Sequence, residues 1–331
     1  MEILDEGQGE LLGWHDPDEN RAWVRDHKPR GLTDKRMSVR EAIQRFVHDG
    51  AYIALGGFGH IRTPMSLLYE IIRQGRRDLA VAGKTAVHDI DILIGGGCVS
   101  KVECAYSFGH EMRGLSPCGR RAVESGQVQV VAEISNAGYQ WRFLAGMMGI
   151  PFIPARNLLG TDTFAKSACK MARDPWSGKP VVLIPAAYPD VALLHVPRCD
   201  RYGNAQIDGI LVEDFELARA ARRVVLTTEE LVDEEQIRCN PRLTAIPYYV
   251  VDAVCLVPFG AHPAQMPYQY FFDEDHIAEW LRMSKTEEGT REYMERYVLG
   301  VSGPEEYLER VGGMERMRAL QQLEEGRLPL V

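Results

Sequence analysis

Three short segments combine residue types that bind anions or stabilise developing negative charge. Residues 56–62 read Gly-Gly-Phe-Gly-His-Ile-Arg, residues 83–85 read Gly-Lys-Thr, and residues 107–111 read Ser-Phe-Gly-His-Glu. In the first, the paired glycines Gly56 and Gly57 let backbone N–H groups approach a ligand, and the positive end of the helix predicted next faces the same place. This combination suits a carboxylate, a phosphate or an oxyanion. A tight strand-to-helix turn without a ligand is the alternative, and the glycine pair alone favours it.

Polar side chains of these segments are the first candidates for contact with a substrate. Arg62 is suited to hold a substrate carboxylate by a bidentate contact, and equally suited to neutralise a structural carboxylate. Ser107, His110 and Glu111 lie in one predicted loop, and loops often carry function. His60 is either a substrate contact or a solvent-exposed loop histidine.

Candidates further along the chain have structural explanations beside functional ones. Asn204 follows a glycine and is expected to stabilise a turn. His262 stands before a proline and is suited either to cap its loop by hydrogen bonds or to lie near the site. An acidic run predicts a solvated helix face; its members are Glu229, Glu230, Glu234 and Glu235.

The elements that position these segments alternate between strand and helix. A capping-box pattern at Ser38 and Glu41 begins a helix, and further helices are predicted at residues 136–148 and after about residue 275. Short continuous apolar runs predict buried strands at residues 51–55, 78–82, 102–106, 128–132, 181–185, 191–196 and 224–227. This alternation predicts an open, mostly parallel α/β sheet with helices on both faces. Ligands of such sheets sit beyond the carboxyl ends of the strands.

The composition sets limits on function and location. The 331 residues include 38 Lys and Arg against 47 Asp and Glu, a formal net charge of −9, which argues against a general nucleic-acid binder. No apolar run approaches the roughly 20 residues of a membrane span, and the acidic N-terminus does not resemble a signal peptide. Seven cysteines without a CxxC pattern predict reduced thiols, a cytoplasmic location and no metal site. We expect an N-terminal arm over residues 1–36 and a single α/β domain over residues 37–331 that includes a C-terminal helical extension.

Several separated motifs resemble one family. Common signatures of dinucleotide, nucleotide, serine-hydrolase and zinc-protease sites are missing. Instead, residues 49–58, with Pro64 six residues on, resemble the first signature of family I coenzyme A transferases. Arg62 replaces the glycine usual before that proline, as in the glutaconate CoA-transferase branch. Residues 200–204 (Asp-Arg-Tyr-Gly-Asn) resemble the family's D-x-x-G-N turn, and residues 251–263 resemble the VDAV…PxGAHP segment of that branch's A subunit.

This resemblance implies an activity shared between two chains. Members move CoA from a thioester to a free carboxylate through a nucleophilic glutamate, which in two-chain members belongs to the B subunit. The resemblance therefore implies that this chain lacks the nucleophile, that CoA is a thioester substrate and not a bound cofactor, and that the acid is small, dicarboxylic and glutaconate-like. It also implies an A2B2 heterotetramer without nucleic-acid or membrane partners. It assigns to this chain an oxyanion and acyl-contact loop made of Gly56, Gly57, Phe58 and Gly59.

Two alternatives stay open. The same scaffold hosts CoA-thioester hydrolases and a decarboxylase, and some of the hydrolases use an acidic residue from this type of chain. Glu133 is the candidate for that acid, although Asn136 stands closer to its expected position. The other alternative is a lone binding module, because a related fold appears in sugar-phosphate isomerases and ligand-sensing domains, and fold alone does not decide function.

Overall fold

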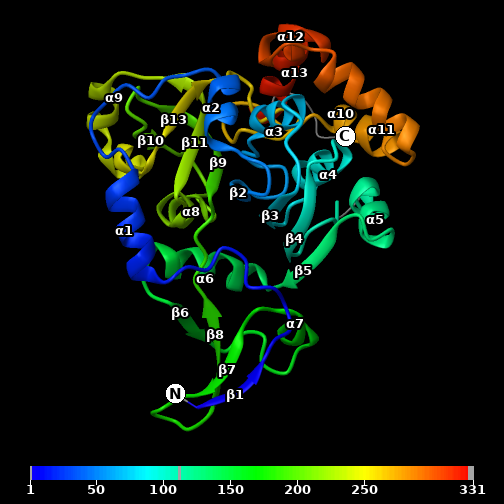
Figure 1. Ribbon diagram of the computed structural model, residues 1–331. Helices are drawn as coiled ribbons and strands as arrows, with labels where there is room; N and C mark the ends of the chain where they lie inside the picture. The colour runs from blue at the N-terminus through cyan, green and yellow to red at the C-terminus, as the bar shows by residue number, and fades with distance from the viewer. Residues whose placement is uncertain (1, 111–112, 327–331) are drawn as a thin grey trace.

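The computed structural model describes residues 2–110 and 113–326 and has an α/β architecture around one large sheet (Figure 1). Its parallel strands lie in the order β5 (Gln129–Glu133), β4 (Val99–Ala105), β3 (Leu79–Lys84), β2 (Tyr52–Leu55), β9 (Val191–Cys199), β11 (Arg223–Leu231) and β13 (Ala253–Leu256). The short strand β10 (Ala205–Gln206) pairs antiparallel with the end of β9, and β12 (Thr244–Ile246) pairs antiparallel with β10. The open, mostly parallel sheet predicted from the apolar runs is confirmed.

Helices cover both faces of this sheet because its strands are apolar on both sides. Successive side chains of a strand point to opposite faces. Along β2, Ile53 and Leu55 therefore belong to one hydrophobic core and Tyr52 and Ala54 to the other. The first core lies under α2 (Val39–Phe46), α3 (Met65–Arg73), α4 (His88–Gly95) and α5 (Pro117–Glu124), and the second lies under α6 (Asn136–Met148) and α8 (Asp214–Ala220).

Two of these helices have the ends that their sequences predict. At the start of α2, Ser38 Oγ accepts a hydrogen bond from the Glu41 N–H at 3.2 Å, and the Glu41 carboxylate accepts one from the Ser38 N–H at 2.9 Å. Helix α6 spans the predicted residues and ends at Gly149, whose φ of 67° is the left-handed conformation that favours glycine. Local capping chemistry therefore sets these boundaries before any tertiary packing.

A small antiparallel sheet extends from the body beyond α6 (Figure 1). Its order is β1 (Ile3–Glu6), β7 (Lys170–Arg173), β8 (Pro180–Pro185) and β6 (Phe152–Ala155), with α7 (Asp162–Lys166) beside it. The segment 1–36 supplies β1 and also helix α1 (Pro17–His27). Trp23 of α1 packs on the body, with the guanidinium groups of Arg222 and Arg223 at 5.1 and 5.0 Å from its ring centroid. This segment is therefore attached to the fold at two places.

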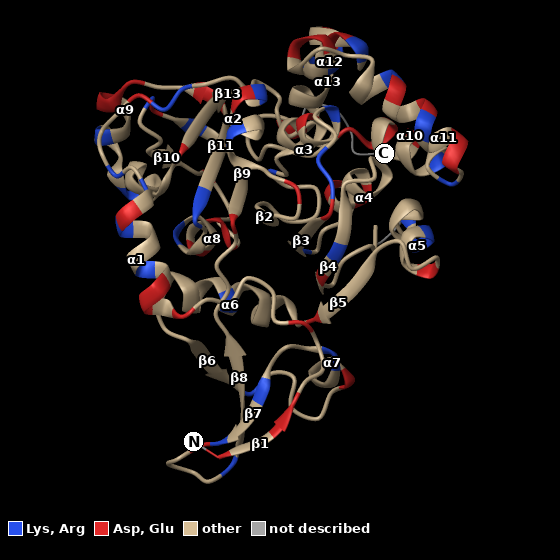
Figure 2. Ribbon diagram, viewed as in Figure 1, with Lys and Arg blue, Asp and Glu red and all other residues tan. Residues whose placement is uncertain are grey.

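The predicted C-terminal helices gather at the opposite end of the molecule from the small sheet (Figure 1). They are α10 (Glu274–Met283), α11 (Glu287–Met294), the π-helical η4 (Glu295–Leu299), α12 (Pro304–Arg310) and α13 (Gly313–Glu324). Figure 2 shows basic and acidic residues interspersed along the ribbons of these outer helices, while the central strands are mostly coloured as uncharged residues. The remaining short helices are α9 (Glu234–Cys239) and the 3-10 turns η2 (Pro241–Leu243) and η3 (Tyr248–Val250). No helix within the described residues combines the length and apolarity that a bilayer span requires.

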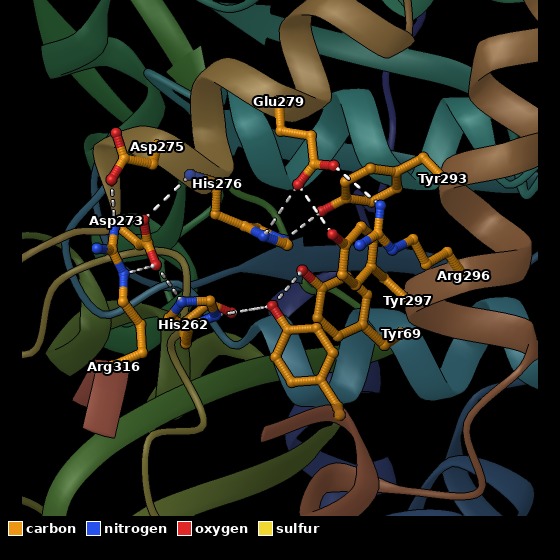
Figure 3. A network of polar contacts seen from close by, with 11 residues as sticks. Tyr69, His262, Asp273, Asp275, His276, Glu279, Tyr293, Arg296, Tyr297 and Arg316 are labelled. Atoms are coloured by element: carbon orange, nitrogen blue, oxygen red, sulfur yellow. Dashed lines mark hydrogen bonds and ion pairs between the residues drawn. The ribbon is translucent and has the colours of Figure 1, made fainter. Parts of the chain in front are cut away.

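A buried polar network fastens the C-terminal helices to the loop after β13 (Figure 3). His262 Nδ1 lies 2.8 Å from the Tyr307 hydroxyl, and its Nε2 lies 3.1 Å from Asp273 Oδ2. Arg316 of α13 forms an ion pair with the same Asp273. His262 thus joins the loop to α12, and through Asp273 to α13, as a residue that caps its loop would do.

Candidate functional site

The loops that follow β2, β3, β4 and β5 meet at the carboxyl edge of the parallel sheet. The Thr85 N–H donates to the Ala105 carbonyl at 2.9 Å, and Ser107 Oγ donates to the Gly83 carbonyl at 3.1 Å. Asn136, the first residue of α6, places its amide nitrogen 3.5 Å from Thr85 Oγ1. The second and third polar segments therefore meet, with Asn136 from a fourth loop beside them. The first segment joins the same surface, because the Phe58 ring centroid lies 5.7 Å from Lys84 Nζ.

This edge also concentrates unusual backbone conformations. Non-glycine residues with positive φ include Arg62 (52°), Thr85 (51°), Tyr106 (56°), Phe108 (70°) and Val212 (49°). Each such conformation costs about 1–3 kcal/mol, and it persists only where the surrounding structure holds it. Thr85 and Val212 are β-branched, for which positive φ is a genuine outlier. Strain of this kind gathers at binding and catalytic sites, which marks these loops as the candidate site.

Within the glycine loop, the N–H groups of Gly59 and His60 have no acceptor among the described residues. The N–H groups of Gly56, Gly57 and Phe58 donate to the Leu193 carbonyl (2.9 Å), the Asp214 carboxylate (3.2 Å) and the Ile61 carbonyl (2.9 Å) in turn. Of the residues that the family resemblance assigns to oxyanion binding, Gly59 is therefore the one with a donor to spare, and the others shape the turn.

Arg62 is held by a carboxylate of this chain. Its guanidinium lies 2.7 Å from Asp214 Oδ2, and both side chains are fully buried. The same guanidinium donates to the Ile210 carbonyl, and the Arg62 N–H donates to the Gln265 carbonyl at 2.8 Å. This geometry corresponds to the second of the two roles that the sequence leaves open, the neutralisation of a structural carboxylate.

A second buried ion pair lies beside the glycine loop, and the sequence analysis did not anticipate it. Lys84 Nζ lies 2.6 Å from Glu213 Oε2, and 5.7 Å from the centroid of the Phe58 ring. Burial raises the pKa of Glu213 to about 8, while the nearby Lys84 ammonium acts in the opposite direction. The adjacent acids Glu213 and Asp214 at the start of α8 thus each lie against one basic side chain of the site edge.

Three histidines come together from consecutive loops. His60 follows β2, His88 begins α4 after β3, and His110 follows β4; the ring centroids of His60 and His110 are 5.6 Å apart, and those of His60 and His88 are 6.3 Å apart. Both ring nitrogens of each histidine are buried, without a hydrogen-bond partner among the described residues. Burial lowers the pKa of His60 to about 3 and that of His110 to about 4, and that of His88 well below its ordinary value. Glu111, the neighbour of His110, lies outside the described residues.

Other predicted residues lie outside this cluster or take structural roles. Glu133, at the end of β5, forms a half-exposed ion pair with Lys166 at 3.1 Å. Asn204 donates to Asp200 at 2.7 Å and accepts from the Tyr248 N–H at 3.0 Å, which is the contact pattern of a turn. Within the described residues, no group of three or more His, Cys, Asp or Glu is arranged to hold a metal ion.

The interpretation of the acidic run as a solvated helix face is wrong for Glu229, while Glu230 is exposed as expected but lies in a strand. Glu229 and Glu230 belong to strand β11, and only Glu234 and Glu235 lie in helix α9. Glu229 is buried: it lies 2.6 Å from His195 Nε2 and accepts a hydrogen bond from the Tyr270 hydroxyl. These partners are distant in sequence, so composition alone could not indicate that the carboxylate is buried.

Comparisons with known proteins agree on one family. Residues 36–256 match the coenzyme A transferase family model. The chain is 32% identical to the A subunit of glutaconate CoA-transferase from Acidaminococcus fermentans, over 84% of this chain and 92% of that protein. The crystal structure of that enzyme superposes with a TM-score of 0.81, covering 87% of this chain and 95% of the other at 31% identity.

Two further relatives extend this result. The chain is 32% identical to the A subunit of 3-oxoadipate CoA-transferase from Pseudomonas knackmussii, over 82% of this chain and 96% of that protein. A crystal structure of a variant of the decarboxylase AibA/AibB is 33% identical with a TM-score of 0.71, covering 80% of this chain and all of that one. The matches extend over most of each chain and include both the strands and the loops of the carboxyl edge, so this chain belongs to the coenzyme A transferase family.

Proposed function

We propose that this chain is the A subunit of a two-subunit CoA-transferase that moves CoA between an acyl-CoA thioester and a small dicarboxylic acid. The observation that carries the proposal is the match to the A subunit of glutaconate CoA-transferase over nearly the whole of both chains. The substrate acid is glutaconate-like in this proposal, and CoA enters as a substrate. The assembly is an A2B2 heterotetramer, and its free cysteines suit the reducing cytoplasm.

In this proposal the division of chemistry between the chains is the one that the family resemblance implies. The partner's glutamate carboxylate attacks the thioester carbonyl, CoA leaves as the thiolate, and an acyl-glutamyl anhydride forms. The thiolate then attacks the glutamyl carbonyl, which releases the first acid and leaves a glutamyl-CoA thioester for the second acid. This chain supplies the Gly59 N–H toward the oxyanion of each tetrahedral intermediate, because that donor is not used within the described fold.

Exposed apolar side chains around the same edge support docking of a partner subunit there. Tyr106 is 65% exposed, Ile210 63% and Tyr268 73%. Ile210 is attached to the glycine loop through its carbonyl contact with Arg62, and Tyr268 lies beside Gly209. Grouped apolar exposure is a feature of interaction surfaces. A partner on this face would exclude water from the reacting carbonyl, which strengthens its hydrogen bonds.

The test is co-expression with the product of the neighbouring reading frame as the candidate B subunit, followed by an assay of CoA exchange. Glutaryl-CoA or acetyl-CoA serves as donor and glutaconate as acceptor, with free thiol followed separately. We expect acceptor-dependent formation of a new thioester without net thiol release. A complex that exchanges no CoA between any thioester and carboxylate would overturn the proposal.

Decarboxylation or hydrolysis of a CoA thioester is the second candidate. The similarity to AibA/AibB, which covers the whole of that chain, favours the former. Incubation of the complex with glutaconyl-CoA and no acceptor acid separates the reactions: carbon dioxide release indicates a decarboxylase, and thiol release a hydrolase. For a hydrolase, Glu133→Gln and Asn136→Asp then test which position of this chain takes part.

A further inference from the structure

The His60, His88 and His110 rings form a buried polar cluster without internal hydrogen bonds. His88 and His110 are each only 2% exposed, and within the described part of the chain all the ring nitrogens of the three residues lack a partner. A buried donor or acceptor that has lost its hydrogen bonds to water and forms none within the protein costs free energy, so such groups are rare in native proteins. Three such rings from three consecutive loops indicate a group that the free chain does not contain.

The surroundings of this cluster define what it would accept. Phe272 lies 6.1 Å from His60 and Trp280 lies 6.1 Å from His88, measured between ring centroids, so aromatic rings pack around the cluster. The cluster lies next to the glycine loop, because its first member, His60, directly follows Gly59 in the sequence. A guest whose reacting carbonyl lies at Gly59 would therefore place the next few atoms of its chain against these rings.

The cations of this edge are already engaged. Arg62 pairs with Asp214, Lys84 with Glu213, and Arg113 with Glu274. Arg62 keeps two guanidinium nitrogens without a partner among the described residues, but a second carboxylate there would meet the like charge of Asp214. The three imidazoles offer donors without such a carboxylate paired to them. A neutral imidazole always carries one N–H, and exchange of tautomer lets either ring nitrogen present it. Three imidazoles match the several acceptor positions of one carboxylate, whose two oxygens accept about four hydrogen bonds.

We propose that His60, His88 and His110 form the subsite that binds the distal carboxylate of a dicarboxylic acyl group. This inference rests on the proposed CoA-transferase function, which it makes more specific. It explains how the site can bind a second carboxylate although Arg62 and Arg113 each face a carboxylate of this chain, and why these rings are buried without partners in the described chain.

The experiment compares acceptor acids on the intact A–B complex. His88→Phe and His110→Phe each keep an aromatic ring and remove its hydrogen bonds. We expect kcat/KM for glutaconate to fall about tenfold to hundredfold, the effect of losing a hydrogen bond to a charged group, while kcat/KM for acetate stays within about twofold. Because the removed nitrogens have no partner among the described residues, we also expect the variants to melt at or above the wild-type temperature.

His276→Phe is the matched control. His276 is also buried, but its Nε2 lies 2.6 Å from the Tyr293 hydroxyl, so its nitrogen is satisfied (Figure 3). We expect this variant to melt at a lower temperature and to keep the wild-type ratio of glutaconate to acetate. The contrast separates loss of a binding group from loss of a structural hydrogen bond.

A binding measurement keeps the inference independent of turnover. Calorimetric titration of the complex with glutarate and with butyrate is expected to show weaker glutarate binding in His88→Phe and His110→Phe, with butyrate unchanged. If the wild-type complex transfers CoA but the variants lose binding of glutarate and butyrate equally, the subsite is overturned and the proposed function stands. A complex without transferase activity that still loses glutarate binding in the variants would overturn the function and support the subsite. Stoichiometric zinc binding abolished by either variant would overturn the subsite in favour of a metal site.

Discussion

At the scale of single residues, the candidate site is held by charges that the fold has buried in pairs. Arg62 and Asp214 are both fully buried, and Asp214 also accepts the Gly57 N–H at 3.2 Å. Removing one member of such a pair leaves the other charged and desolvated, which destabilises the fold far more than removing both. The pair therefore stabilises the glycine loop.

Arg62→Met is expected to lower the free energy of unfolding by about 3–5 kcal/mol because Asp214 loses its counterion. The double variant Arg62→Met/Asp214→Asn is expected to recover at least half of that loss, since no charge stays buried and the amide oxygen still accepts from Gly57. Urea unfolding of the isolated chain measures both. A single variant of unchanged stability with a raised KM for the acid would instead assign Arg62 to the substrate.

The unpaired histidines make stability depend on pH in a direction that can be worked out. Burial lowers the pKa of His110 to about 4 from an ordinary value of 6.5. The unfolded chain therefore binds a proton at His110 below about pH 6.5, whereas the folded chain binds it only below about pH 4. Because the unfolded state binds more protons in between, the free energy of unfolding falls as the pH drops through this window.

His110→Phe removes this contribution. Between about pH 7 and about pH 5 the variant is expected to lose about 2 kcal/mol less stability than the wild type. Urea unfolding at the two pH values gives the comparison. Burial also lowers the pKa of His276, so His276→Phe is expected to change the pH dependence of stability in the same direction. Parallel pH profiles for wild type and His110→Phe would contradict a neutral buried His110.

At the scale of elements, the glycine loop depends on a backbone conformation that favours glycine and on close packing around it. Gly57 has a φ of 84°, and a Cβ built there would lie 2.4 Å from the Ile61 carbonyl oxygen. Gly50, which follows α2, has a φ of 76° but open space around the same position. The two glycines share the backbone conformation and differ in the room for a side chain.

Gly57→Ala and Gly50→Ala therefore form a matched pair. The shared left-handed backbone costs about 1–2 kcal/mol in both variants. Gly57→Ala carries an added steric cost and displaces the loop that presents the Gly59 N–H, so we expect at least about a tenfold loss of kcat in the A–B complex, as for loss of an oxyanion donor. Gly50→Ala is expected to keep wild-type kcat. Equal activity of the two variants would show that the loop geometry is not used.

The elements also show where sequence reasoning succeeds and where it stops. Continuous apolar runs identified β2, β3, β9 and β11, because parallel strands are buried on both faces. The run at β8 looks the same but belongs to the small antiparallel sheet, and periodicity cannot distinguish the two. Strand β1 is short and mostly exposed, so it gave no signal at all.

The candidate site divides in the same way. The glycines and polar loops could be found because each is a local pattern at the end of an apolar run. The sequence does not indicate the pair of Lys84 and Glu213 or the cluster of His60, His88 and His110, because their members come from separate parts of the chain. Their contact exists only once strand order and register are fixed, which is tertiary information.

At the scale of the whole molecule, exposed aromatic side chains lie at two distant places. Tyr268 is 73% exposed beside Gly209, the neighbour of Ile210, whose carbonyl contacts Arg62. Trp176 is 93% exposed on the turn between β7 and β8 at the tip of the small sheet (Figure 1). Both are large aromatic side chains on the surface, so a change to either alters solubility in a similar way. Of these two, Tyr268 borders the proposed docking face of the B subunit.

Tyr268→Glu is expected to weaken assembly with the B subunit by about tenfold or more, because a charge replaces an aromatic anchor that the partner would bury. Its free energy of unfolding as an isolated chain is expected to change by less than about 0.5 kcal/mol, as for other surface substitutions. Trp176→Glu is the control and is expected to assemble as the wild type does. Analytical ultracentrifugation of each variant with the B subunit measures the dissociation constant and the stoichiometry together. Equal weakening in both variants would place the interface elsewhere. A Tyr268→Glu chain that assembles normally would contradict an active site shared at the carboxyl edge, because the partner's nucleophile must reach the Gly59 N–H across that face.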